Sequence, residues 1–164
     1  MKALGIGVIV ALVFIAGLSI YKSQKKSLQI TDFKNTDEMM VYLAAEAVRD
    51  AEKEYHIKLD YSVQSIEQVE AVLSKFHEQY LKDKASVAVN GLATAYGAYI
   101  GEVIKRSTPD AKWERDHPVA GEKSYPMHWK GGESFPCGWC YKRITNGPED
   151  NVWHKYQVLK QQRS

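Results

Sequence analysis

Residues 85–106 read ASVAVNGLATAYGAYIGEVIKR, the most apolar segment of the chain beyond its first 21 residues. Apolar side chains recur along it at steps of three and four, the spacing that places them on one face of an α-helix. Small residues at Ala93, Gly97 and Gly101 lie four apart, so they line one edge of the helix and let a neighbouring backbone approach closely. The segment therefore predicts a central helix packed against a sheet, with an apolar face made by Val89, Leu92, Ala93, Tyr96, Tyr99, Ile100 and Val103.

Two amphipathic helices are predicted before this segment. The first begins after Asn35, a predicted N-cap with Glu38 as its reciprocal partner. Ser62 is the predicted cap of the second, and residues 57–61 alternate in polarity, as a strand or an extended link would. The apolar positions with helical spacing are Met40, Leu43, Ala44, Ala47, Val48, Ala51 and Tyr55 in the first helix, and Ile66, Val69, Leu73, Phe76 and Tyr80 in the second.

The chain changes character after Thr108-Pro109-Asp110, which is expected to end the central helix. Residues 112–116, 125–130 and 134–144 are predicted strands, because aromatic side chains alternate with other residues and turn signals separate the segments. Alternate residues of a strand share a face, so the aromatic side chains are expected on one face of a small antiparallel sheet. A final helix is predicted after residues 146–148, with a docking stripe of Val152, Tyr156 and Leu159.

The N-terminus carries an apolar run, ALGIGVIVALVFIAGLSIY at residues 3–21, which has neither a charge nor a proline. A helix needs about 20 such residues to cross a bilayer core. We therefore expect a transmembrane anchor over residues 1–21, a basic linker over residues 22–34 and an α+β domain over residues 35–164. In this α+β domain, three helices pack on a small antiparallel sheet and a C-terminal helix follows.

A cleaved signal peptide is the alternative for this run. Lys2 gives it a basic start, and Gly17-Leu18-Ser19 has small residues at cleavage spacing. The apolar stretch is longer than a usual signal core and no A-x-A site follows it, which favours an uncleaved anchor. A literal count of flanking lysines, with Lys22, Lys25 and Lys26 after the run, favours a cytoplasmic domain.

We nevertheless expect the opposite orientation, because an N-terminal span with almost no chain to translocate before it enters like an uncleaved signal. This prediction places the protein in the inner (cytoplasmic) membrane as a single-pass protein with an extracytoplasmic domain. Its partners would be the membrane, through residues 3–21, and a protein that the sequence does not identify.

Composition excludes other classes of partner and cofactor. Lysine and arginine number 22 against 20 acidic residues, a formal net charge of +2, and no run of like charges marks a nucleic-acid surface. The sequence has no phosphate-binding glycine loop, no G-x-S-x-G elbow and no H-E-x-x-H motif. We therefore expect no nucleic-acid partner, no cofactor and no set of catalytic residues.

Cys137-Gly138-Trp139-Cys140 is the one motif with chemical potential. A CxxC pair exchanges disulfides when a helix N-terminus lowers the pKa of its first thiol. Here a strand is predicted, and residues three apart in a strand point to opposite faces, so the two sulfurs could meet only through a bulge or turn at Gly138. The favoured interpretation is a pair of ordinary strand cysteines, reduced or joined as a structural bridge, with a redox pair as the alternative.

Zinc is the other chemical interpretation of these cysteines. Cys137 and Cys140 have ligand spacing, His154 lies downstream, and His117 or His128 could supply a fourth ligand. No H-x₃₋₅-H pair completes the pattern, so no metal site is predicted.

Three short motifs carry a resemblance to a known class of proteins. The first, before a predicted helix, is Leu59-Asp60-Tyr61-Ser62. The second, in the central helix and followed by Trp113, is Gly97-Ala98-Tyr99-Ile100-Gly101-Glu102-Val103. The third, a turn, is Lys142-Arg143-Ile144-Thr145-Asn146-Gly147. Over residues 57–160 the chain resembles small bacterial α+β domains of unknown function with a GAYxGEV-type central helix. The resemblance implies one sheet with packed helices, and it implies an apolar strand at residues 135–143. It carries over no activity.

Together these observations predict a membrane-anchored, non-catalytic binding or accessory domain, of the kind found in inhibitor and immunity proteins. The alternative is an exported thiol-disulfide protein that uses Cys137 and Cys140.

Overall fold

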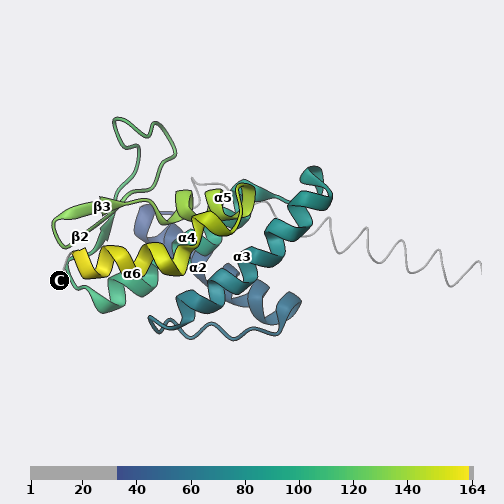
Figure 1. The fold of residues 1–164 in the computed structure, drawn as a ribbon. Coiled ribbons are helices and arrows are strands. Elements are labelled where there is room, and N and C mark those ends of the chain that lie inside the picture. The colour runs from purple at the N-terminus through teal and green to yellow at the C-terminus, as the bar shows by residue number, and fades with distance from the viewer. Residues whose placement is uncertain (1–32, 163–164) are drawn as a thin grey trace, which may run out of the picture. The chain divides into compact units, whose positions relative to one another are not determined.

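Helix α4 (Val89–Ser107) forms the centre of the fold, as predicted, and makes its most extensive contacts with α2 (Thr36–Tyr55) and α5 (Pro136–Thr145). The computed structural model describes residues 33–162, which contain five α-helices and a three-stranded antiparallel sheet (Figure 1). The remaining helices are α3 (Ser65–Lys82) and α6 (Val152–Gln162), with two 3₁₀-helices, η2 (Lys84–Ser86) and η3 (Pro148–Asp150). The α+β class is confirmed.

The predicted span at residues 3–21 and most of the linker over residues 22–34 lie outside the described residues. No helix between residues 33 and 162 is both long enough and apolar enough to cross a membrane.

The predicted cap of α2 is confirmed. Asn35 Oδ1 accepts a hydrogen bond of 2.8 Å from the Glu38 N–H, and the Glu38 carboxylate accepts one of 2.7 Å from the Lys34 N–H. The reciprocal bond thus goes to the residue before the cap, whereas a capping box uses the N–H of the cap itself.

Helix α3 begins at Ser65, two residues later than predicted, because the chain turns after Ser62, whose carbonyl accepts a hydrogen bond from the Ser65 hydroxyl at 2.6 Å. Residues 57–61, predicted as either a strand or an extended link, form an extended link. Tyr99 on α4 fastens this link, since its hydroxyl accepts a 2.7 Å hydrogen bond from the Tyr61 N–H and lies 2.6 Å from Ser65 Oγ.

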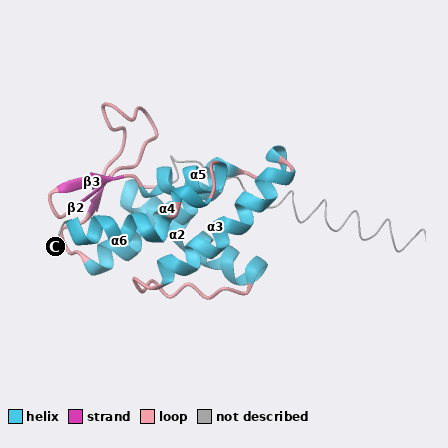
Figure 2. Cartoon of the chain, in the orientation of Figure 1, coloured by secondary structure: helices cyan, strands magenta, loops and turns pink. Residues whose placement is uncertain are grey.

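The sheet is small and lies at one end of the described helices (Figure 2). Its strands are β1 (Lys112–Trp113), β2 (Met127–Trp129) and β3 (Gly132–Ser134), in the order β1-β2-β3. Met127 and Trp129 are buried while His128 is half-buried, so the predicted alternation in β2 is confirmed. Trp129 stacks on Tyr156 of α6 with ring centroids 6.2 Å apart, which joins the sheet to the last helix.

The predicted strand over residues 134–144 is wrong, and so is the apolar strand implied by the resemblance. Only Ser134 belongs to a strand, and helix α5 begins at Pro136. Proline suits the first turn of a helix, where its missing N–H would have no partner. The buried residues Pro136, Cys140, Arg143 and Ile144 are spaced at four, three and one, as one helix face requires. Consequently the three predicted helices pack largely on one another and on α5.

Candidate functional site

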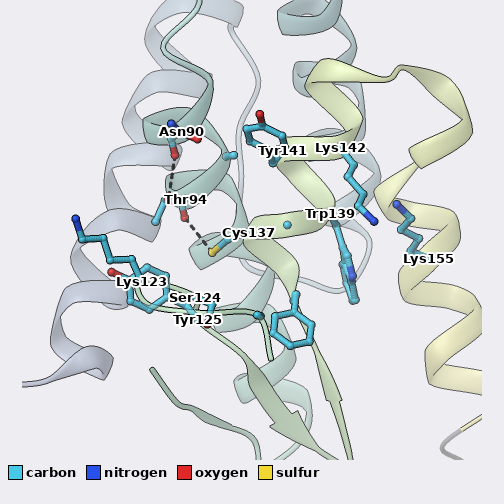
Figure 3. Close-up of a pocket in the computed structure, with 14 residues that line it drawn as sticks. Asn90, Thr94, Lys123, Ser124, Tyr125, Cys137, Trp139, Tyr141, Lys142 and Lys155 are labelled. Atoms are coloured by element: carbon cyan, nitrogen blue, oxygen red, sulfur yellow. Dashed lines mark hydrogen bonds between the residues drawn. The ribbon is translucent and has the colours of Figure 1, made fainter. Parts of the chain in front are cut away.

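The clearest concave site is a cavity of about 540 Å³ between α4, α5 and the loop before β2 (Figure 3). Its floor includes Ala93 and Thr94 of α4, and Cys137 and Gly138 of α5 form one wall. Most of the remaining lining is aromatic or basic: Tyr125, Phe135, Trp139, Tyr141, Lys123, Lys142 and Lys155. Asn90, Ala120 and Ser124 complete it. None of the described residues that line it carries a carboxylate, so the cavity presents cations and aromatic rings together.

Cys137 lies in this wall because α5 and α4 approach closely at Gly97. A Cβ atom built on Gly97 would lie 2.5 Å from the Cys137 backbone nitrogen and 2.9 Å from its sulfur, so only glycine allows this contact. The thiol donates to the Thr94 carbonyl with a sulfur–oxygen distance of 3.8 Å (Figure 3). The close approach predicted for the small-residue edge of α4 is therefore confirmed, although the neighbour at Gly97 is a helix.

Both thiols of the CxxC motif are held in the protonated form. Burial raises the pKa of Cys137 to about 12 and raises the pKa of the fully buried Cys140 well above its ordinary value. Both cysteines are free thiols. The sequence argument expected no helix at this motif, yet Cys137 is the second residue of α5. The helix N-terminus that thiol exchange needs is thus present, but burial outweighs its effect on the thiol.

The basic residues of the cavity come from three segments of the chain. In Figure 3, Lys142 of α5 and Lys155 of α6 extend to the same side of Trp139, whereas Lys123 lies on the other side of Cys137. Lys155 forms an ion pair with Asp150 and donates a hydrogen bond to its carboxylate. This hydrogen bond is the main reason why the pKa of Asp150 is lowered. The Lys142 and Lys123 ammonium groups form no hydrogen bond or ion pair within the described part of the chain.

The residues of the zinc alternative are not brought together. Cys140 is fully buried, whereas His154 is exposed on α6. Among residues 33–162 no group of three or more histidine, cysteine or acidic side chains is arranged to hold a metal ion.

His117 and His128, the histidines considered as fourth zinc ligands, instead lie close to two glutamates beside the sheet. His128 Nε2 lies 3.1 Å from Glu114 and 3.2 Å from Glu133, its cross-strand neighbour. His117 Nδ1 accepts hydrogen bonds from the N–H groups of Val119 and Ala120, so the proton of the neutral ring is on Nε2, 3.0 Å from Glu133. This network orders the long loop between β1 and β2.

Sequence reasoning singled out Cys137, which lines the cavity, and Cys140, which lies in the core behind it, but missed the basic and aromatic residues of the lining. Lys123, Trp139, Tyr141, Lys142 and Lys155 are separated by up to 32 positions, and no local motif joins them. The available signal was Pro136 before Cys137-Gly138, which marks a helix start and puts Gly138 and Lys142 on one face.

Comparison with known proteins gives a family and no activity. The family model described as uncharacterised protein YwmA matches residues 25–159, most of the chain. A comparison with the curated proteins and with the solved structures found no match. The match confirms the resemblance to small α+β domains of unknown function. The chain therefore belongs to the YwmA family of uncharacterised proteins.

Proposed function

We propose that this protein is a membrane-anchored accessory domain that acts by binding, and that the cavity between α4 and α5 is the centre of its binding surface. The observation that carries the proposal is the lining of this cavity, in which three lysines and four aromatic side chains surround a protonated thiol. Ligand sites are concave, largely apolar and equipped with a few convergent polar groups, as this cavity is.

Binding is favoured over disulfide exchange because a nucleophilic cysteine must be a thiolate near neutral pH. Burial moves the pKa of Cys137 and of Cys140 in the opposite direction. The resulting thiols act as small apolar groups of the wall and the core.

A protein partner is favoured by the rim of the cavity. Tyr141 lines the cavity and is 45% exposed, and Val119, next to the lining residue Ala120, is 90% exposed. Exposed apolar side chains at the mouth of a cavity are typical of interaction surfaces, and tyrosine is enriched in them. Such a partner could be inhibited or assisted by the domain, as in inhibitor and immunity proteins.

Photocrosslinking tests the binding surface. The full chain would be expressed in its native membrane with p-benzoylphenylalanine at Tyr141 or, as a matched control, at Leu81, which is 67% exposed on α3 and does not line the cavity. We expect a discrete protein adduct from position 141 and none from position 81. Equal labelling at both positions, or none at either, would refute the proposed surface.

The anchor rests on the apolar run at residues 3–21 and on Lys2 before it. A reporter that is active only outside the cytoplasm, fused after Ser164, should give signal, and the protein should sediment with membranes at its uncleaved mass. Activity of a cytoplasm-only reporter would instead reverse the orientation and give weight to Lys22, Lys25 and Lys26.

A further inference from the structure

We propose that the cavity between α4 and α5 binds a small aryl carboxylate, a flat aromatic ring that carries one carboxylate group. This inference rests on the proposed function and specifies the chemistry that the same site recognises.

The negative group of the ligand is assigned to the side of Trp139 where Lys142 and Lys155 converge (Figure 3). Lys142 follows Gly138 by one helical turn, so both residues face the cavity from α5. Phe135 gives α5 no side-chain cap, and the Gly138 N–H has no hydrogen-bond partner among residues 33–162. An ammonium group and an uncapped N–H at the start of a helix both favour a carboxylate.

A single negative charge fits this side better than a doubly charged phosphate. The Lys155 ammonium is already paired with Asp150, so its charge is largely neutralised. The Lys142 ammonium forms no ion pair among the described residues, but its charge also lowers the pKa of Asp150. Two ammonium groups and one carboxylate therefore leave a net charge of +1 on this side, and Lys123 lies on the other side of Cys137 (Figure 3).

The apolar body of the ligand is assigned to the aromatic walls. Trp139 and Phe135 belong to the α5 segment and Tyr125 to the loop before β2, so rings approach the cavity from two segments of the chain. Stacked or edge-on contact with these rings favours a flat aromatic group. A volume of about 540 Å³ is in the range that holds a small organic ligand.

Fluorine NMR on the full chain in lipid nanodiscs tests this assignment, with empty nanodiscs as the blank. The probes are 3-(4-fluorophenyl)propionate, the matched neutral amide 3-(4-fluorophenyl)propionamide, and inorganic phosphate as a competitor. The variants are Lys142→Gln and, as a control, Lys58→Gln, an exposed lysine of the link between α2 and α3 that does not line the cavity. Both substitutions remove one surface charge and leave the core untouched.

We expect the carboxylate to bind at least about tenfold more tightly than the amide, because a hydrogen bond to a charged group contributes roughly that factor. Lys142→Gln should remove most of this difference and Lys58→Gln should not. Phosphate should fail to displace the probe.

Equal binding of the carboxylate and the amide, displacement by phosphate at equal concentration, unchanged affinity in Lys142→Gln, or no binding of either probe at millimolar concentration would each overturn the inference. The photocrosslinking experiment detects a protein adduct at position 141 and uses none of these probes. A crosslink without probe binding therefore refutes the ligand class alone, and probe binding without a crosslink refutes the protein-binding surface alone.

Discussion

Two glycines of α4 set how closely its neighbours approach. A Cβ atom on Gly97 would overlap the backbone of Cys137, and one on Gly101 would lie 2.5 Å from Cη2 of the Trp113 indole. At Gly91, on the same helix, a Cβ atom would meet nothing within 4 Å. The same substitution should therefore have opposite effects at positions 91 and 97.

Gly97→Ala should lower the free energy of unfolding by about 1 to 3 kcal/mol, because the backbone of α5 must move to admit the methyl group. Gly91→Ala should raise it by up to about 1 kcal/mol, since alanine favours a helix over glycine. Urea denaturation of both variants measures the difference. A Gly97→Ala variant as stable as Gly91→Ala would contradict the close contact between α4 and α5.

The thiol of Cys137 should be unreactive in the folded protein. Its pKa of about 12, against an ordinary 9.0, lowers the thiolate fraction near pH 8 by about a thousandfold. Iodoacetamide should therefore alkylate the native protein very slowly, as followed by mass spectrometry, and should alkylate both cysteines readily in urea. Rapid modification of the native protein at neutral pH would contradict the raised pKa of this half-buried thiol and favour the redox alternative.

Among the elements, α3, α5 and α6 are joined by one partly buried carboxylate. Glu70 on α3 accepts hydrogen bonds from Arg143 Nε of α5 at 2.5 Å and from the Val152 N–H at the start of α6 at 2.9 Å. The Arg143 side chain is only 4% exposed, and its Nη1 has no partner among the described residues. Glu70 is therefore the group that neutralises the buried Arg143 guanidinium.

Glu70→Ala should lower the free energy of unfolding by about 3 to 5 kcal/mol, because it leaves a buried guanidinium without its counter-ion. Glu78→Ala, on the exposed side of the same helix, should change it by less than about 0.5 kcal/mol. Thermal or urea denaturation of the two variants checks the contrast. Equal, small losses would show that Arg143 is solvated when Glu70 is removed.

The same buried pair explains why α5 was predicted as a strand. Helices α2, α3 and α4 could be predicted because their buried residues are apolar and recur at helical spacing. In α5 one of the buried positions is the charged Arg143, which hides that spacing. The alternation of Phe135, Trp139 and Tyr141 with small or polar residues then gave a false period of two. A charge that is buried because a distant residue neutralises it cannot be recognised from the local sequence.

The candidate site shows the same limit. The cysteine motif could be found in the sequence, but its surroundings depend on tertiary structure. Gly97 brings α5 onto α4, and the loop that carries Lys123 and Tyr125 is placed by the sheet and its histidine–glutamate network. The raised pKa of both thiols comes chiefly from this burial, and the neighbouring Cys137 adds to the shift at Cys140.

At the scale of the whole molecule, residues 33–162 contain a continuous core of their own. It runs from Met39 and Met40 of α2 to Tyr156 of α6, and all four tryptophans lie within it or against it. The family match over residues 25–159 covers the same part of the chain. A chain without the N-terminal apolar run keeps every core residue found between residues 33 and 162.

A chain of residues 27–164 should thus be soluble and should unfold in one cooperative transition, because it keeps all the buried core residues of the part of the chain that the structure describes. Circular dichroism and tryptophan fluorescence should give coincident urea curves, with a slope of about 1 to 3 kcal/mol per molar urea. A chain of residues 27–135 is the matched control, since it lacks the fully buried Cys140, Ile144, Val152 and Tyr156 and should not unfold cooperatively. Cooperative unfolding of that shorter chain would show that α5 and α6 are attached to a core that is complete without them, and the cavity on α5 would then be formed by a separately docked segment.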